Sequence, residues 1–140
     1  QAPPTKPTLT SPSDGFRTND STPTLEWTPA TNADNHRVLV DDDVGFGSPA
    51  ENDLLGSEDD NYTTGALADG TYYWEIVAIN AIGENESDTR SFIVDTTPPT
   101  ISGVSASNIT QTSATITWTT DENSDSLVEY GTTTGYGSTE

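Results

Sequence analysis

The side chains best suited to acid–base or metal chemistry in this sequence are one histidine and a large number of carboxylates. His36 is the single histidine and there is no cysteine, so thiolate metal sites, thiol nucleophiles and disulfides are excluded. A Ser-His-Asp triad would have to use His36, which we interpret instead as a strand residue that faces the core. Carboxylate pairs would suit glycoside hydrolysis, but 23 Asp and Glu residues form pairs by chance on any surface. We therefore expect no catalytic site.

The charge balance is strongly acidic. Only 4 Lys and Arg residues stand against the 23 carboxylates, which gives a net charge of −19. Binding to phosphate groups requires cationic side chains, so nucleic acid is excluded as a partner and an anionic membrane surface is disfavoured. The longest unbroken apolar run, Ile76–Ile79, is far too short to span a bilayer. Because the chain begins at Gln1 and has no Met, we expect a processed chain or a piece of a larger one.

The elements that would position these residues are strands. Apolar residues alternate with polar ones in short runs bounded by Gly, Pro, Asn and Asp, and no stretch has a helical period. Such alternation predicts strands with one buried face. The residues expected to face the core of the first part of the chain are Pro23, Leu25, Trp27, His36, Val38, Val40, Tyr72, Trp74, Ile76, Ala78, Phe92 and Val94.

Two landmarks recur at similar offsets. Pro3-Pro4-Thr5 returns as Pro98-Pro99-Thr100, and the Trp27 segment (LEWT) returns as the Trp118 segment (ITWT), offsets of 95 and 91 residues from 3 to 98 and from 27 to 118. A period near 90 residues is the size of one β-sandwich domain. The second copy shows three strands, around 101–104, 114–118 and 126–130, and then the sequence stops. Two hypotheses follow: the chain was merely trimmed, or strands of another copy complete the second sandwich.

A family resemblance becomes visible at these residues. The segment LADGTYYWEIVAINAIG (67–83) resembles the sixth strand of a bacterial or archaeal fibronectin type III domain, with its tyrosine corner, and FIVDTTPP (92–99) resembles the last strand and linker. The segment 112–136 (TSATITWTTDENSDSLVEYGTTTGY) resembles the opening of a second such domain and is similar to the N-terminal domain of purple acid phosphatases. The resemblance implies an all-β immunoglobulin-like sandwich over residues 1–96 and the first half of another over 97–140. His36 departs from the family, which commonly places an inward aromatic there.

The acidic residues gather at the junction of these two expected domains. In the fold that the resemblance implies, turns at the C-terminal pole of the first domain face turns at the N-terminal pole of the second. The simpler interpretation is a solvated acidic surface, and no cofactor is required. Calcium takes six to eight oxygen ligands, so the alternative hypothesis is a Ca²⁺ ion bound at the junction, although no EF-hand loop is present. The candidate ligands are Asp41, Asp42, Asp43, Asp69, Asp95, Asp121, Glu122 and Asp125.

Two further kinds of surface site follow from motifs. Four Asn-x-Ser/Thr sequons predict glycosylation in loops or at strand ends, at Asn19, Asn61, Asn85 and Asn108. Four aromatic residues, Phe46, Tyr73, Tyr130 and Tyr136, would stack on sugar rings if they were exposed together. The alternative places Tyr130 in the core and scatters the others over the surface.

These features favour a non-catalytic module at the cell surface. We expect an extracellular structural or assembly segment of a surface layer, sheath, stalk or filament, whose partners are copies of itself or adjacent domains of the same polypeptide. The alternatives are an adhesion module that binds carbohydrate or protein, and a spacer domain of a secreted hydrolase. The fold alone does not separate them, because sandwiches of this kind serve all three purposes.

Overall fold

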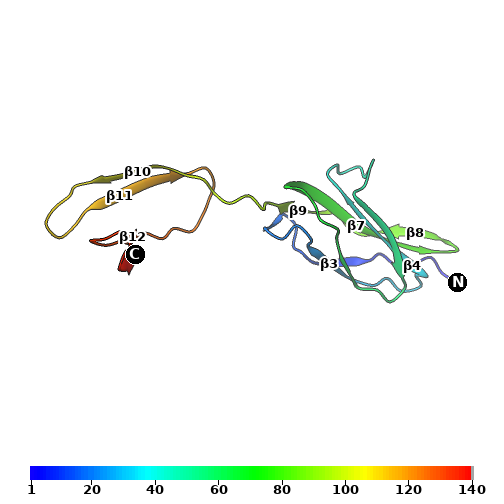
Figure 1. The fold of residues 1–140 in the computed structure, drawn as a ribbon. Helices are drawn as coiled ribbons and strands as arrows, with labels where there is room; N and C mark the ends of the chain where they lie inside the picture. The colour runs from blue at the N-terminus through cyan, green and yellow to red at the C-terminus, as the bar shows by residue number, and fades with distance from the viewer. Residues whose placement is uncertain (140) are drawn as a thin grey trace. The chain divides into compact units, whose positions relative to one another are not determined.

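The computed structural model describes residues 1–139 and divides into two compact units, Gln1–Thr97 (unit 1) and Pro98–Glu140 (unit 2). All regular structure in the described residues is β-strand (Figure 1), and none of them forms a helix long and apolar enough to cross a membrane. The strands of unit 1 are β1 (Thr8–Ser11), β2 (Phe16–Thr18), β3 (Thr24–Thr28), β4 (Asn35–Asp41), β5 (Glu51–Gly56), β6 (Asn61–Thr63), β7 (Gly70–Asn80), β8 (Gly83–Glu86) and β9 (Arg90–Val94). Those of unit 2 are β10 (Ile101–Ser107), β11 (Thr115–Thr120), β12 (Glu129–Tyr130) and β13 (Ser138–Thr139).

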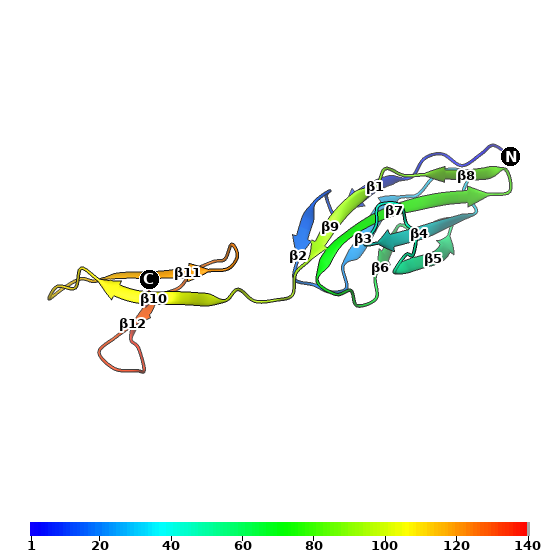
Figure 2. The same ribbon diagram turned by 90° about the horizontal axis from the view of Figure 1, so that it is seen from above.

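Unit 1 is a β-sandwich, which confirms the predicted fold class. One sheet has the strand order β1-β3-β6, and the other has the order β2-β9-β7-β4-β5 with β8 added to β7. The neighbouring strands are antiparallel except β2 and β9, which are parallel. The long strand β7 pairs with β9 along its first half and with β8 along its second half, as Figure 2 shows.

The core lies between the two sheets and follows the predicted alternation. Along β3 buried and exposed residues alternate strictly, so Leu25 and Trp27 point inward while Glu26 points outward. Opposite them, the inward side chains of β4, β7 and β9 close the core. The buried cluster consists of Leu9, Leu25, Trp27, Val38, Val40, Leu67, Trp74, Ile76, Phe92 and Val94.

A tyrosine side chain secures the start of β7. The Tyr72 hydroxyl donates a hydrogen bond to the carbonyl oxygen of Ala68 at 3.0 Å, and the Tyr72 ring stacks on Phe92 with 5.7 Å between centroids. This is the tyrosine corner that the resemblance implied, and it fixes the loop that leads into the longest strand of the sandwich.

Unit 2 contains two separate strand pairs, β10–β11 and β12–β13. The third strand expected over 126–130 is reduced to Glu129–Tyr130, and Tyr130 is 50% exposed rather than in a core. Among residues 98–139 the two pairs do not join into one sheet. Its apolar side chains therefore remain largely exposed, whereas their counterparts in unit 1 are buried.

Candidate functional site

Strand register brings the five predicted acidic site residues of unit 1 to one end of the sandwich. Asp41 at the end of β4 pairs with Tyr73, and Gly70 at the start of β7 pairs with Val94 at the end of β9. Because the chain leaves unit 1 here, we call this the exit end. The predicted site residues Asp41, Asp42, Asp43, Asp69 and Asp95 belong to its strand ends and loops.

Asp69 fastens the segment through which the chain leaves unit 1. One carboxylate oxygen accepts hydrogen bonds from the Thr96 amide (2.8 Å) and the Thr96 hydroxyl (2.7 Å), and the other accepts from the Thr97 hydroxyl (2.6 Å). The hydrogen bond from the Thr97 hydroxyl, followed by the two from Thr96, lowers the pKa of Asp69 to about 2. The ionised carboxylate of Asp69, rather than the protonated acid, therefore holds the exit segment.

This anchor makes the stability of unit 1 depend on pH in a defined window. The pKa of Asp69 is about 2 when folded, against an ordinary value of 3.8, so its contribution is complete above about pH 4 and is lost as the pH falls towards 2. We expect the melting temperature of the wild type to exceed that of Asp69→Asn at pH 6, and the difference to shrink between pH 4 and pH 2. Thermal melts of both proteins across this range check it. A difference that does not change with pH would contradict it.

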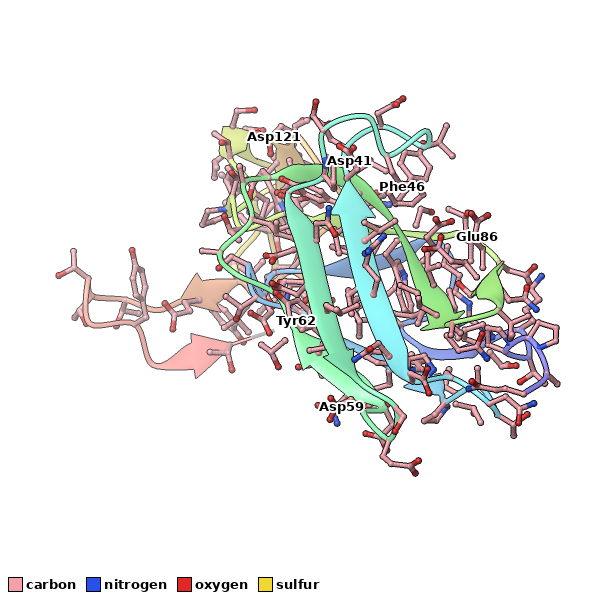
Figure 3. All side chains as sticks on the ribbon, turned by 90° about the vertical axis from the view of Figure 1, so that its right-hand side faces the viewer. Asp41, Phe46, Asp59, Tyr62, Glu86 and Asp121 are labelled. Atoms are coloured by element: carbon pink, nitrogen blue, oxygen red, sulfur yellow. The ribbon has the colours of Figure 1, made fainter. Side chains whose placement is uncertain are left out.

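Asp41 organises the loop that follows β4 (Figure 3). Its carboxylate accepts hydrogen bonds from the Ser48 amide (3.0 Å) and the Asp43 amide (3.3 Å), and its side chain is buried. Burial raises the pKa of Asp41, but these hydrogen bonds outweigh it and leave the pKa below the ordinary value. The loop also holds Phe46 in a left-handed conformation, with φ of 51°. The structure thus uses Asp41 to shape a loop.

The remaining predicted ligands are dispersed or bonded to protein groups. Asp95 pairs with Arg17 at 3.0 Å, and Asp43 accepts a hydrogen bond from the Gly45 amide. In unit 2, the Asp121 carboxylate accepts from the Thr100 amide at 2.7 Å, which lowers the pKa of Asp121. Asp42 and Asp125 are exposed, and Glu122 is half-buried.

Within residues 1–139, no group of three or more His, Cys, Asp or Glu side chains is arranged to hold a metal ion. The calcium site, whose candidate ligands come from both units, stays a prediction.

The opposite end of unit 1, where the chain enters, is organised by Asn80. Its side-chain amide donates hydrogen bonds to the carbonyl oxygens of Ala2 (2.8 Å) and Asn32 (2.6 Å), and its oxygen accepts from the Ile82 and Gly83 amides. Asn80 is only 8% exposed, and all of its hydrogen-bonding capacity is used. In the sequence Asn80 appears only as one residue of the segment 67–83, because no local pattern reveals a bond to residue 2.

Three further contacts hold the entry segment. Asn85 donates to the Pro4 carbonyl oxygen at 3.1 Å, Lys6 forms an ion pair with Asp88 at 2.6 Å, and the Thr5 amide donates to the Thr31 carbonyl oxygen at 3.0 Å. Side chains of unit 1 therefore anchor both the segment that enters it and the segment that leaves it.

His36 is buried as a structural residue. Its Nε2 accepts a hydrogen bond from the Ala30 amide at 3.0 Å, and its Nδ1 lies 3.2 Å from the Gly56 carbonyl oxygen. An acceptor at Nε2 and a carbonyl partner at Nδ1 require the neutral ring with its proton on Nδ1. The ring also packs against Trp27, with 6.3 Å between centroids. The core interpretation is correct, and burial is complete.

A tyrosine joins two carboxylates at the edge between the sheets (Figure 3). The Tyr62 hydroxyl donates towards Asp53 and, at 2.7 Å, towards Glu51, whose other oxygen accepts from the Gly65 amide at 2.7 Å. Burial, and then the hydrogen bonds to Asp53 and Glu51, raise the pKa of Tyr62 well above its usual range. Because β5 and β6 belong to different sheets, the cluster links the two layers, and sequence analysis missed it.

The four sequons differ in accessibility. Asn19, Asn61 and Asn108 are exposed, while Asn85 is half-buried and its amide is bonded to Pro4. Ser87, the hydroxyl residue of the Asn85 sequon, is buried and accepts a hydrogen bond from the Ile76 amide. Modification of the four sites stays a prediction, and Asn85 presents the least accessible acceptor.

The aromatic candidates fall into two groups. Phe46 and Tyr73 are half-buried in unit 1. Tyr130 and Tyr136 are 50% and 56% exposed in unit 2, and both line a hollow of about 560 Å³. The structure therefore brings two of the four residues to one concave surface.

Unit 2 also has two further hollows, of which the first is mainly apolar. One, of about 270 Å³, is lined by residues that include Ile101, Val104, Ile116 and Trp118. The other, of about 530 Å³, shares Ile116 and also includes Tyr130.

The sheet order of unit 1, with its tyrosine corner, defines a fibronectin type III-like sandwich. No family model matches the chain, and no curated protein matches it. Among solved structures, the chain is similar to a Fn3-like protein from Clostridium thermocellum, with 22% sequence identity and a TM-score of 0.49. That match covers 67% of this chain and 93% of the other.

Proposed function

We propose that this chain is a non-catalytic structural module that carries tension or sets spacing in an extracellular assembly, such as a surface layer, sheath, stalk or filament. The observation that supports it most directly is the path of the chain through unit 1. The entry segment is bonded to Asn80 at one end of β7, and the exit segment leaves beside Gly70 at the other end. The two ends are separated by the length of an 11-residue strand, roughly 33 Å.

Anchoring at both ends suits such a role. A load applied to the chain reaches the sandwich through the contacts of Asn80 and Lys6 at the entry and through those of Asp69 and Arg17 at the exit. Because Asn80 belongs to β7 and Arg17 to β2, these contacts pass load to strands other than the terminal strands β1 and β9. A module that only displayed a binding loop would not need them.

Pulling on single molecules tests this function. The chain has no Cys, so one cysteine added at each end gives a unique pair of attachment points. We expect unit 1 to unfold in one step that releases about 90 residues, or about 30 nm of chain. We expect Asn80→Ala to lower the unfolding force more than Asn85→Ala, which removes a single hydrogen bond. Unfolding of unit 1 without a resolved force step would contradict a structural role.

Carbohydrate binding is the second candidate, and it rests on one observation. Tyr130 and Tyr136 are exposed at the same hollow of unit 2, where two rings could stack on a sugar. A glycan array probed with the full chain, beside the variant that carries Tyr130→Ala and Tyr136→Ala, separates the two functions. Binding that is lost in the double variant would favour an adhesion module.

A further inference from the structure

The two outer faces of the unit 1 sandwich differ in chemistry. Along β1, β3 and β6 the outward residues are all polar and exposed, and they are Thr8, Thr10, Thr24, Glu26, Thr28, Asn61 and Thr63. This is the ordinary composition of a sheet face that meets water. The outer face of the other sheet departs from it, because four outward side chains of β4, β5 and β7 are apolar: Leu39, Leu54, Val77 and Ile79.

Strand register places these four side chains next to one another, and we call them the apolar face. Leu54, Arg37 and Val77 lie in one row across β5, β4 and β7, and Leu39 and Ile79 lie in the rows on either side. Val77 is 4% exposed, Leu39 and Ile79 are half-buried, and Leu54 is 57% exposed. Apolar side chains that gather on the outside of a sandwich mark an interaction surface.

Three carboxylates border the apolar face. Glu84 and Glu86 lie beside it on β8, and Glu75 lies on β7 two residues before Val77 (Figure 3 shows Glu86). Glu75 is half-buried, and its carboxylate accepts a hydrogen bond from the Thr89 hydroxyl at 3.2 Å. Burial raises the pKa of Glu75, and the charge of Glu86 adds to the rise, although the Thr89 hydrogen bond opposes it. A cation brought to this border would therefore relieve repulsion between carboxylates.

The cationic side chains of this sequence are poorly placed to supply that charge. Lys6 and Arg17 are held in ion pairs, and Arg90 donates to three carbonyl oxygens. The fourth, Arg37, belongs to this same sheet face and forms no ion pair within residues 1–139. A second copy could therefore offer only its own Arg37 against three carboxylates, while the rest of its surface is acidic and repels.

We propose that the apolar face is a docking surface for a basic protein, one that presents lysine or arginine side chains around an apolar centre. The apolar centre of the partner covers Leu39, Leu54 and Ile79, and its cations lie against the three carboxylates. Arg37 stands among these side chains, so a partner that fits also places a hydrogen-bond acceptor opposite it. Complementary charges of this kind fix the orientation of a partner and reject acidic ones.

This inference goes beyond the proposed function, since it assigns to the module a partner other than its own copies. The two fail separately. A chain that bears force but binds no basic probe would overturn the docking surface and leave the structural role intact. Binding without a resolved force step would have the reverse meaning.

Two synthetic peptides of equal charge test the docking surface. One alternates lysine with leucine over about seven residues, and the other has serine in place of each leucine. We expect the full chain to bind the first at least about tenfold more tightly in about 0.15 M NaCl, where attraction between distant charges is screened. Amide NMR shifts recorded during the titration should change most on β4, β5, β7 and β8, and least on β1, β3 and β6.

Matched charge variants separate this face from the net charge of the whole chain. Glu75→Gln combined with Glu86→Gln should weaken binding of the lysine–leucine peptide about fivefold, because each lost charge pair contributes up to about 1 kcal/mol. Glu26→Gln combined with Glu58→Gln removes the same charge elsewhere in unit 1 and should have little effect. Circular dichroism melts establish that both double variants fold.

Matched apolar variants test the centre of the face. Leu54→Ser should weaken binding at least about fivefold, because it removes an apolar side chain that the peptide would cover. Ile101→Ser removes a similarly exposed side chain from unit 2 and should not weaken it. Equal binding of the two peptides, shifts spread over both faces, or equal losses in a face variant and its control would overturn the proposal. So would a chain that dimerises through this face without peptide, because a second copy would then cover it.

Discussion

Replacing Trp74 by alanine is expected to lower the free energy of unfolding of unit 1 by about 3–5 kcal/mol. Trp74 is fully buried at the centre of the core cluster, and its neighbours in the sheet are Val40 on β4 and Arg90 on β9. Truncation removes a large apolar surface from the core and leaves a cavity. Because β7 is hydrogen-bonded to β4 on one side and to β9 on the other, it cannot move to close that cavity. Urea unfolding of the full chain, followed by far-ultraviolet circular dichroism, measures the loss.

Two matched variants make the result specific. The Trp74 indole Nε1 is buried without a hydrogen-bond partner, so Trp74→Phe removes an unsatisfied donor together with part of the ring. We expect it to cost less than half of what Trp74→Ala costs. Trp118→Ala removes a tryptophan side chain from unit 2, where it is partly exposed, and should leave the unfolding of unit 1 unchanged. Equal losses for Trp74→Ala and Trp118→Ala would contradict the assignment of the core.

Replacing Arg90 by alanine is expected to cost about 3 kcal/mol, a large effect for a side chain that is only half-buried. Its guanidinium donates to the carbonyl oxygens of Leu9 (2.8 Å), Thr10 (3.2 Å) and Pro12 (2.8 Å). Arg90 belongs to β9 and its acceptors lie in and after β1, so these bonds join the two sheets. Hydrogen bonds from a charged donor are the strong ones, and their loss leaves carbonyl groups unpaired.

Arg17→Ala is the matched control for Arg90→Ala. The Arg17 side chain is 63% exposed and makes an ion pair with Asp95 at 3.0 Å. Exposed pairs of this kind contribute at most about 1 kcal/mol, so this variant should unfold close to the wild type. Arg90→Lys should recover only part of the loss, because one ammonium group cannot reach three carbonyl oxygens in the geometry of a guanidinium. Arg90→Ala and Arg17→Ala with the same stability would refute the role given to Arg90.

The strands of unit 1 could be predicted from the sequence because their signal is local. Alternation over 72–79 identifies β7 and the face that carries Trp74 and Ile76. The same pattern predicts that Val77 faces solvent, yet it is 4% exposed. In the sheet Val77 lies beside Arg37, with Leu54 and Glu86 in the same row. Neighbours on other strands cover it, and periodicity within one strand contains no information about them.

The polar sites were predicted less completely. The sequence places acidic residues at turns, and register brings several of them to the exit end of unit 1. It does not reveal that Asp69 would be engaged by Thr96 and Thr97, or that Asp41 would shape its own loop. In the same way, Tyr62 meets Glu51 and Asp53 only because strands of different sheets approach each other at one edge.

By itself the sequence determined that this protein is an all-β sandwich with a defined inner face, and that it is acidic and lacks cysteine chemistry. These properties depend on composition and on the alternation of apolar and polar residues along each strand. Both are visible in residues that are neighbours in the sequence. Only the tertiary structure decided that Asn80 and Arg90 tie together segments about 80 residues apart. The physical reason is that their partners are backbone groups. Every residue has a carbonyl oxygen, so only the folded chain selects which one a side chain meets.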